Sequence, residues 1–539
     1  MATVHRERAL AAPGEVALRD SRTELSWTDV DRVVNRVADG LHGLDLGPDR
    51  RVAVFARNSV ETVLAHVGIV HAGCSPVPTS FHLTAPELAY ILTDSRAAAL
   101  FVGPENAAVG YEAARRAGVP VVVGWRCPDG DGDVVPWDRW LAAASDDDPP
   151  ADVPALPFLS YTSGTTGTPK GVNALAGSPV PGTTVDEYVR SLRTLPLAQW
   201  PGHLVVGPLH HTGPLAGVRL VACGLPVTVL EKFDAEAVLA TVARYRIATT
   251  LMVPTHFHRL LALPGDVRAR YDVGSLRLVT HTGATCPPDV KRAMIDWFGP
   301  VLFDSYGGSE SGPLCGISTE DWLERPGSVG RVRPPFVRAV AVAADGTELP
   351  PGAVGRLAFE ERDGRSVAYL NAEQKTSEAL IRPGLFTLGD IGYVDADGFV
   401  FITDRATDMI ISGGVNIYPA EIEHVLLAHP DVADVAVIGV PDPEMGESVL
   451  AVVVPRGGAP TAADLVAHCR TALAGYKVPR AFEFRDDLGR TAMGKLAKRL
   501  LREPYWTARA QPSPSSPPLS SPADSPATAV PSSTSWTSS

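Results

Sequence analysis

The chain has 539 residues, which is too long for a single hydrophobic core, so it should form at least two domains. Its composition, 45% hydrophobic and 20% charged, is ordinary for a globular enzyme. A net charge of −13 argues against a nucleic-acid partner, which requires a basic face, and against attraction to an anionic lipid surface.

The cysteines and the N-terminal residues bear on the compartment. The six cysteines are scattered and none forms a C-x-x-C pair, which favours free buried thiols over a disulfide framework or a zinc site. The first residues carry charges where a signal peptide needs an apolar segment. No uncharged apolar run approaches the roughly 18 residues of a membrane span. The sequence therefore predicts a cytoplasmic protein with no membrane span.

The first half of the chain alternates short apolar runs with helical patterns. Residues 51–55 predict a strand, 59–72 predict a helix with one apolar face, and 74–78 predict a second strand. Similar strands are expected at 98–102, 119–123, 204–206, 227–230, 249–253 and 276–280. Repetition of strand, helix and strand favours an α/β fold with a mostly parallel sheet covered by helices.

After Gly327 the pattern changes to short strands separated by Gly, Pro and Asp turns. Strands at 338–342, 356–360 and 399–402 predict a small antiparallel, barrel-like unit. A compact α+β domain should follow, with a helix from Pro419 to 428, strands at 435–440 and 449–454, and a helix at 461–474. From about Arg509 the chain is Ser, Pro, Ala and Thr, which cannot bury a core and should be disordered.

Residues 161–172, Tyr-Thr-Ser-Gly-Thr-Thr-Gly-Thr-Pro-Lys-Gly-Val, are the most informative segment. Its glycines allow a tight bend, its hydroxyl and backbone N–H groups can donate to an anion, and Lys170 supplies positive charge. The segment lacks the G-x-x-x-x-G-K-[ST] spacing of the P-loop, so it predicts a different phosphate-binding loop. The alternative is a flexible Ser/Thr/Gly loop on the surface.

This segment closely resembles the ATP-binding loop of the adenylate-forming superfamily, which comprises acyl- and aryl-CoA synthetases, adenylation domains and luciferases. The resemblance covers nearly everything from about Ala17 to Arg502, including 55–59, 72–78 and 84–92. It implies an α/β fold in which a large N-terminal domain of two α/β subdomains plus a distorted β-barrel precedes a small mobile α+β domain. The expected boundaries are 1–404 for the N-terminal domain, 405–408 for a hinge, 409–505 for the C-terminal lid domain and 506–539 for a disordered tail.

The resemblance also implies the chemistry. A carboxylate attacks the α-phosphorus of ATP and expels pyrophosphate, so the protein needs cations, hydrogen-bond donors and Mg²⁺ in a dry cleft. It assigns Thr166, Glu310 and Lys495 to catalysis. The residues that it assigns to the nucleotide and co-substrate are Thr162, Ser163, Gly164, Thr165, Thr166, Gly167, Lys170, Gly283, Ala284, Asp304, Tyr306, Ser309, Asp390, Arg405, Ser412, Gly413 and Gly414.

A second motif, Tyr306-Gly-Gly-Ser-Glu310, resembles the Y-G-x-T-E motif of the family. By this resemblance Tyr306 covers the adenine face, Ser309 donates to the α-phosphate and Glu310 holds Mg²⁺. Gly283-Ala284 matches the turn that forms a shelf for the adenine. Asp304 is either an acceptor for the adenine amino group or a solvated loop aspartate.

Two further positions complete the implied nucleotide site. Asp390 corresponds to the ribose ligand, since a carboxylate can accept from both hydroxyls, and Arg405 would add a positive contact near ribose and phosphate. A structural salt bridge between these two residues is the alternative. Lys495 would bridge the incoming carboxylate and the α-phosphate, or else be a solvated lysine. Residues 489–495 also satisfy G-x-x-x-x-G-K, but Leu496 replaces the Mg²⁺-binding Ser/Thr, which excludes a P-loop there.

Other segments concern the acid and the thiol. His211 falls where the family has an aromatic–histidine pair that lines the acyl pocket; a neutral core histidine with a backbone partner is the alternative. The loop at Ser412 resembles one that forms a pantetheine tunnel, and 476–479, Tyr-Lys-Val-Pro, resembles a segment that can touch CoA. Thr407 occupies the hinge position, where relatives usually have a charged residue.

These features predict an ATP- and Mg²⁺-dependent acid–CoA ligase that acts on a fatty, steroid-side-chain or aryl acid. One rival is an adenylating enzyme that passes its product to a separate carrier protein or to an amine. Another activates nitrite for aryl-amine diazotisation. A third possibility is a degenerate nucleotide-binding regulator.

Overall fold

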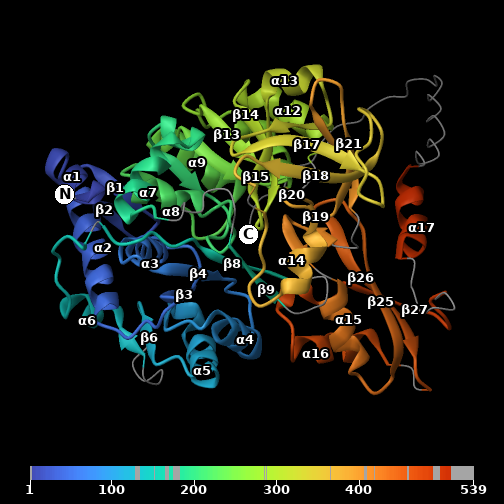
Figure 1. Ribbon diagram of the computed structural model, residues 1–539, viewed down its shortest axis with the longest axis horizontal. Coiled ribbons are helices and arrows are strands. Elements are labelled where there is room, and N and C mark those ends of the chain that lie inside the picture. The colour runs from blue at the N-terminus through green and yellow to red at the C-terminus, as the bar shows by residue number, and fades with distance from the viewer. Residues whose placement is uncertain are drawn as a thin grey trace, which may run out of the picture.

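The structure is a computed structural model, in which the following residues are described: 3–127, 134–150, 152–163, 169–173, 182–283, 286, 288–364, 366–405, 410–417, 419–457, 460–489 and 498–510. Together they form an α/β protein with a large N-terminal domain and a small C-terminal domain (Figure 1). The predicted fold class is therefore confirmed.

The first α/β unit is a parallel sheet in the order β4-β3-β5-β6-β7. Its strands are β3 (Arg51–Phe55), β4 (Ser75–Thr79), β5 (Ala99–Val102), β6 (Val121–Gly124) and β7 (Val135–Pro136). Helices α3 (Val60–His71), α4 (Ala85–Ser95) and α5 (Ala107–Ala117) connect them. The Ser59 side chain accepts from the Thr62 backbone N–H at the start of α3, and nearly every residue of that helix is buried. The strand–helix–strand prediction for 51–78 is thus confirmed.

The largest sheet joins a parallel part to an antiparallel part. Strands β10 (His203–Val205), β11 (Val227–Val229), β12 (Thr249–Met252), β13 (Leu278–His281) and β14 (Leu302–Gly308) are parallel. The antiparallel part contains β15 (Gly312–Ser318), β16 (Ser328–Val332), β17 (Phe336–Val342), β18 (Gly355–Glu361), β21 (Asp390–Val394) and β22 (Val400–Arg405). Because parallel strands end on one side, the segments after β12, β13 and β14 meet at a single edge of the sheet.

The predicted phosphate-binding segment forms an antiparallel pair, β8 (Leu159–Ser163) with β9 (Pro169–Asn173). Tyr369 bridges to Val172, and the Leu370 backbone N–H donates to the carbonyl of Gly171. The chain around Tyr369 therefore adds to this hairpin just before α14 (Glu373–Ala379). Figure 1 shows β9 beside α14, between the N-terminal sheets and the C-terminal domain.

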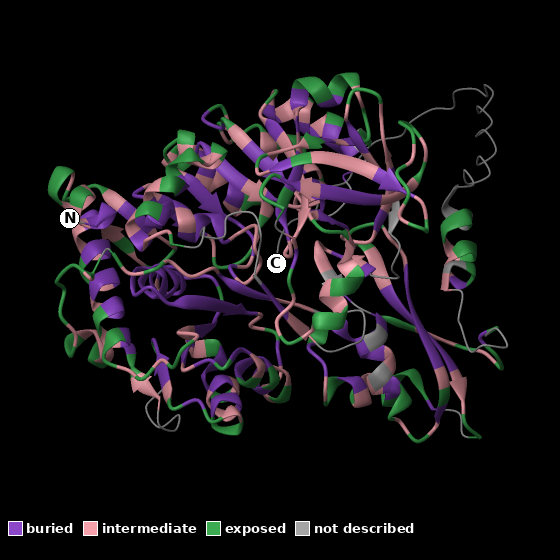
Figure 2. Ribbon diagram, in the orientation of Figure 1, coloured by how far each residue is buried: buried purple, intermediate pink, exposed green. Residues whose placement is uncertain are grey.

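The C-terminal domain is an α+β unit. Its sheet contains β23 (Ile410–Ser412), β24 (Val415–Ile417), β25 (Val432–Asp442), β26 (Gly446–Pro455) and β27 (Ala481–Phe484). Helices α15 (Pro419–Leu427) and α16 (Ala462–Arg470) cover one face, and the buried strands are visible in Figure 2. Helix α16 ends four residues before the predicted position, and the short 3₁₀ turn η4 (Gly475–Lys477) follows it.

A helix that the sequence did not predict, α17 (Lys498–Ala510), covers the other face of β25. Leu501 is buried there, and the Trp506 indole N–H donates to the carbonyl of Gly439 at 3.2 Å. The expected start of the disordered tail at 506 is therefore wrong, because this helix buries side chains on the sheet. Residues 511–539 lie outside the described part of the chain.

Two further expectations concern the chain as a whole. All six cysteines are free thiols, and five of them are buried. Within the described residues, none of the helices has both the length and the apolar character needed to cross a membrane.

Candidate active site

Tyr306 and Asp390, which the sequence assigned to adenine and ribose, contact each other. Tyr306 lies on β14 and Asp390 is the first residue of β21, and the phenol donates to Oδ2 of Asp390 at 2.6 Å. Asp390 is only 5% exposed, so the hydroxyl offsets part of the cost of burying its charge. Arg405 pairs with Asp390 in backbone register across β21 and β22, and its side chain is outside the described set.

Glu310 lies in the turn between β14 and β15 and is approached by two hydroxyl groups. The Tyr369 hydroxyl donates to Oε1 of Glu310 at 3.3 Å, and Thr162 Oγ1 lies 3.5 Å from the same oxygen. Thr162 belongs to the β8–β9 hairpin, so this contact joins the two predicted nucleotide motifs. Beside Glu310, the Ser309 hydroxyl accepts from Thr212 Oγ1 at 3.4 Å.

The glycines of the β14–β15 hairpin lie close to neighbouring atoms of the site. A Cβ atom at Gly308 would lie 2.8 Å from Oε2 of Glu310 and 3.1 Å from Leu388. A Cβ atom at Gly307 would overlap the backbone of Gly312. Side chains at these positions would therefore displace Glu310, Leu388 or the backbone of Gly312, which explains the two consecutive glycines.

Asp304 is an ion-paired strand residue. It lies on β14, its Oδ2 is 3.1 Å from Nζ of Lys291, and its Oδ1 is 3.6 Å from Nδ1 of His281. Burial lowers the pKa of Lys291, and burial also lowers the pKa of His281 to about 4. The expectation of a solvated loop aspartate is wrong, since Lys291 holds this carboxylate in place.

Lys170 belongs to the β8–β9 hairpin, which the sequence predicts to bind phosphate. It lies on β9 opposite Thr162, and burial together with the neighbouring Lys375 lowers its pKa. Lys375 itself pairs with Glu378 of α14. The backbone of Ser163 ends β8. The other predicted members of the loop, Gly164, Thr165, Thr166 and Gly167, lie outside the described residues.

The C-terminal domain contributes the turn between β23 and β24 to this edge. Gly413 and Gly414 have positive φ angles of 57° and 78° and follow Ser412. A Cβ atom at Gly414 would lie 3.1 Å from Cγ1 of Val253, and one at Gly283 would lie 3.9 Å from the Gly414 carbonyl oxygen. The turn thus approaches the segments after β12 and β13. Ala284, Thr407 and Lys495 are outside the described residues.

His211 belongs to an aromatic cluster beside this edge. Its ring centroid is 4.2 Å from that of His210, which lies 5.2 Å from the ring of Phe81. Burial lowers the pKa of His211 to about 4, with a further contribution from His82. Burial also lowers the pKa of His210. The histidines are therefore neutral at physiological pH and suit an apolar wall. The ring of His82 lies 5.5 Å from that of Tyr476 in the C-terminal domain.

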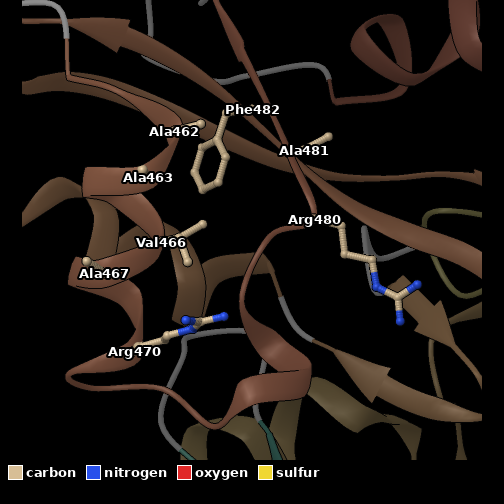
Figure 3. A pocket seen from close by; sticks show the side chains of 8 residues that line it. All are labelled: Ala462, Ala463, Val466, Ala467, Arg470, Arg480, Ala481 and Phe482. Atoms are coloured by element: carbon tan, nitrogen blue, oxygen red, sulfur yellow. The ribbon is translucent and has the colours of Figure 1, made fainter.

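A separate cavity of about 380 Å³ lies on the C-terminal domain between α16 and β27. Figure 3 shows the ring of Phe482 above Val466, with Arg480 pointing away from both. None of the predicted site residues lines this cavity, so it is distinct from the edge described above.

Comparison with known proteins gives the family. Residues 5–364 match the AMP-binding enzyme family, and residues 421–495 match the AMP-binding enzyme C-terminal domain. The chain belongs to the AMP-binding enzyme family. It is 36% identical to a feruloyl-CoA synthase from Amycolatopsis sp, over 92% of this chain and 97% of that protein. It is 33% identical to an indoleacetate–CoA ligase from Aromatoleum aromaticum, over 91% and 95% of the two chains. The prediction of an AMP-forming acid–CoA ligase is confirmed at the level of reaction class.

Solved structures agree with this fold and match it to different extents. An o-succinylbenzoate CoA synthetase from Bacillus subtilis, 26% identical, matches over 93% of this chain and 98% of its own. Its TM-score is 0.77 in the complex with a product analogue, OSB-NCoA, and 0.62 in the complex with the acyl-adenylate intermediate. An amide bond synthetase from Marinactinospora thermotolerans, 29% identical, also reaches a TM-score of 0.77, with 94% of this chain and 100% of that chain covered.

Several residues of the site were missed by sequence reasoning. Tyr369 is one, because no local pattern links it to Glu310, which is 59 residues away. Lys291 could have been predicted from the sequence, because it shares a helical face with Met294 and Phe298, which are buried. A lysine on an apolar face requires a buried anion nearby.

Proposed function

We propose that this enzyme is an ATP-dependent acid–CoA ligase for an aryl or fatty carboxylic acid. A carboxylate oxygen attacks the α-phosphorus of ATP, the bond to the β-phosphate breaks and pyrophosphate leaves. The sulfur of CoA then attacks the acyl carbon, its proton is lost to solvent, and AMP leaves with the electron pair of the carbon–oxygen bond. The observation that carries the proposal is the meeting of Tyr306, Glu310 and Asp390 at one sheet edge, facing the hairpin of Lys170.

In this proposal Asp390 accepts from the ribose hydroxyls and Tyr306 lies against the adenine. The hydrogen bond from Tyr306 to Oδ2 fixes the orientation of the carboxylate before the nucleotide arrives. An ionised carboxylate has about four acceptor positions, so one bond from Tyr306 leaves it able to accept others. By the same count Asp304 can accept from the adenine amino group while Lys291 holds its other oxygen.

Lys170, the hydroxyls of the 162–166 loop and Ser309 would bind the phosphates, with Arg405 near the ribose. Gly283 and Ala284 would form the adenine shelf. Lys495 would bridge the carboxylate and the α-phosphate in the first step. These roles follow from the motifs. Burial and the neighbouring Lys375 lower the pKa of Lys170, and a bound phosphate would oppose that shift.

Mg²⁺ would be held by Glu310. The donor set fits, because Mg²⁺ is commonly bound by one or two carboxylates together with substrate phosphates and waters. Thr162 and Tyr369 orient the Glu310 carboxylate from the other side. The ion would neutralise charge that develops on the phosphates.

For the second step we propose that the described arrangement of the domains is the thiol-transfer arrangement. Two observations support it: the turn at Gly413 and Gly414 lies against Val253 and Gly283, and the overall arrangement is more similar to a complex with a CoA-product analogue than to one with an acyl-adenylate. The first step would then use another arrangement, reached by rotation within the proposed hinge at 405–408.

For the acid we propose an aromatic carboxylate as the first choice and a fatty acid as the second. The feruloyl and indoleacetate relatives act on aromatic acids, and the neutral rings of His210, His211 and Phe81 suit an aromatic or apolar group. Burying apolar surface against such a wall stabilises the complex by roughly 25 cal/mol per Å².

ATP–pyrophosphate exchange with a panel of aryl, fatty and steroid-side-chain acids tests this function. We expect exchange with at least one aromatic acid, and thioester formation only when CoA is added. Product formation with a carrier protein, an amine or nitrite in place of CoA would support the corresponding rival. The absence of exchange with every acid in the panel would contradict the proposal and favour a nucleotide-binding regulator.

A further inference from the structure

A buried cluster of charges joins the two domains. Nζ of Lys477, on η4 of the C-terminal domain, lies 3.1 Å from Oε1 of Glu87 and 2.7 Å from Oε1 of Glu421. Glu87 belongs to α4 of the N-terminal domain, whereas Glu421 belongs to α15 of the C-terminal domain. The side chains of Lys477, Glu87 and Glu421 are 3%, 11% and 9% exposed, so the cluster is largely removed from water.

Both carboxylates occupy the first turn of a helix and point to the same ammonium. Glu87 also accepts from the backbone N–H and the hydroxyl of Thr84 through its second oxygen, Oε2, which forms the capping box of α4. Each carboxylate therefore faces the positive end of a helix dipole and the same ammonium. Oε1 of Glu87 is aimed across the domain boundary.

Burial raises the pKa of Glu421, against the opposite influence of Lys477. For Lys477 burial acts to lower the pKa, yet Tyr476, Glu421 and Glu87 together raise it above its ordinary value. The lysine is thus held in its charged form. Its ammonium is engaged by two carboxylates, one from each domain.

We propose that Lys477 and Glu87 are positioning residues that hold the C-terminal domain in the thiol-transfer arrangement. This inference rests on the proposed function. When the domains separate, Lys477 keeps its bond to Glu421, because both residues belong to the C-terminal domain. Its bond to Glu87 breaks, and water then hydrates the Glu87 carboxylate and the side of the ammonium that faced it. Only the bond to Glu87 is therefore specific to this arrangement, and its loss changes how often the arrangement is populated.

The chain offers a matched control at the same boundary. Nη2 of Arg259, in the N-terminal domain, lies 2.8 Å from Oε1 of Glu444 in the C-terminal domain, but these side chains are 40% and 63% exposed. An exposed pair of this kind contributes little, whereas breaking a buried pair leaves an uncompensated charge. Glu444→Gln and Glu87→Gln both replace a carboxylate at the domain boundary with an amide. Glu444 is exposed, whereas Glu87 is largely buried. Glutamine at 87 also preserves the capping box of α4.

The test measures the two half-reactions separately, with the aromatic acid that gives the fastest ATP–pyrophosphate exchange. For Glu87→Gln we expect thioester formation from the preformed acyl-adenylate and CoA to slow about tenfold or more, with exchange changed less than about twofold. Lys477→Met should show the same split. In the double variant the losses should not add, because both changes remove the bond between Lys477 and Glu87, although Lys477→Met also removes the bond to Glu421. Glu444→Gln should leave both half-reactions unchanged.

A second readout does not depend on activity. Amide hydrogen exchange at 475–478 and 84–88 should increase in Glu87→Gln and stay unchanged in Glu444→Gln. Equal slowing of both half-reactions, additive losses, or unchanged exchange at these amides would overturn the inference. Failure of the unmodified enzyme to catalyse exchange with any acid would instead overturn the proposed function on which it rests.

Discussion

Among the residues that the structure describes, two lysines are almost completely buried, one in each domain, and their partners differ. Lys291 is 1% exposed and pairs with Asp304 of its own domain, while its ammonium lies 4.7 Å from the ring centre of Trp322. Lys477 is 3% exposed and pairs with Glu421 of its own domain and with Glu87 of the other. The first pair lies within one domain, so we expect it to affect folding. The second joins the two domains, so under the inference above it affects the reaction cycle.

The largest expected effect is that of replacing Lys495, which lies outside the described residues. Lys495→Ala should slow acyl-adenylate formation by about a thousandfold, because one charge interaction at about 4 Å contributes roughly 4 kcal/mol at an effective dielectric near 20. ATP–pyrophosphate exchange measures this step. Lys498→Ala is the control, since Lys498 pairs with Glu423 at 2.7 Å within the C-terminal domain. Equal activity of Lys495→Ala and the parent would exclude Lys495 from catalysis.

Lys291→Met tests whether the intradomain pair is structural. It leaves the carboxylate of Asp304 without its ammonium, so we expect the free energy of unfolding of the N-terminal domain to fall by about 3–5 kcal/mol in urea titrations. Arg270→Met, which breaks an exposed pair with Asp266, should cost less than about 1 kcal/mol.

The double variant Lys291→Met/Asp304→Asn should recover part of the stability lost in Lys291→Met, since it removes the unpaired charge. A loss confined to the adenylation rate, with no change in stability, would contradict the structural role of this pair.

The sequence predicted the elements and the motif residues better than the contacts between them. Strand 51–55 and helix 419–428 reappear as β3 and α15 because each has a local hydrophobic period. Tyr306 and Asp390 were both assigned to the nucleotide, but their hydrogen bond joins residues 84 positions apart. Nothing local encodes such a pairing.

The same limit applies to the lysine that joins the domains. The partner of Lys477 in the N-terminal domain is 390 residues away in the chain. No local pattern around Lys477 indicates that its ammonium is buried between two carboxylates. Helix α17 was not predicted for a local reason. Pro504 within it and the Ser/Pro-rich chain after it are both typical of non-helical segments.

The buried histidines predict that acid destabilises the N-terminal domain. Burial lowers the pKa of His66 and His281 to about 4 and that of His203 and His256 to about 3, all in this domain. In the unfolded chain each imidazole titrates near 6.5, so acid favours unfolding. Stability should be complete above about pH 6.5 and fall as pH decreases toward 4, by about 2–3 kcal/mol for each histidine.

Urea titrations of the N-terminal domain between pH 7.5 and 4.5 measure this loss. His281→Gln should remove the contribution of one imidazole to this loss, so the free energy of unfolding should depend less on pH. Stability that stays constant over this range would contradict neutral burial of these histidines.

Tyr306→Phe should have the smallest effect and the most specific one. It removes the hydroxyl that donates to Asp390 and keeps the ring, so only the orientation of the carboxylate changes. A hydrogen bond to a charged group contributes about 1.5 kcal/mol, and we expect the KM for ATP to rise roughly tenfold with kcat nearly unchanged. Tyr393→Phe is the control, because Tyr393 lies on β21, the strand of Asp390, and stacks on Phe401. A fall in kcat with KM unchanged would mean that the hydroxyl acts in the transition state, and the assignment of Asp390 to the ribose would then be wrong.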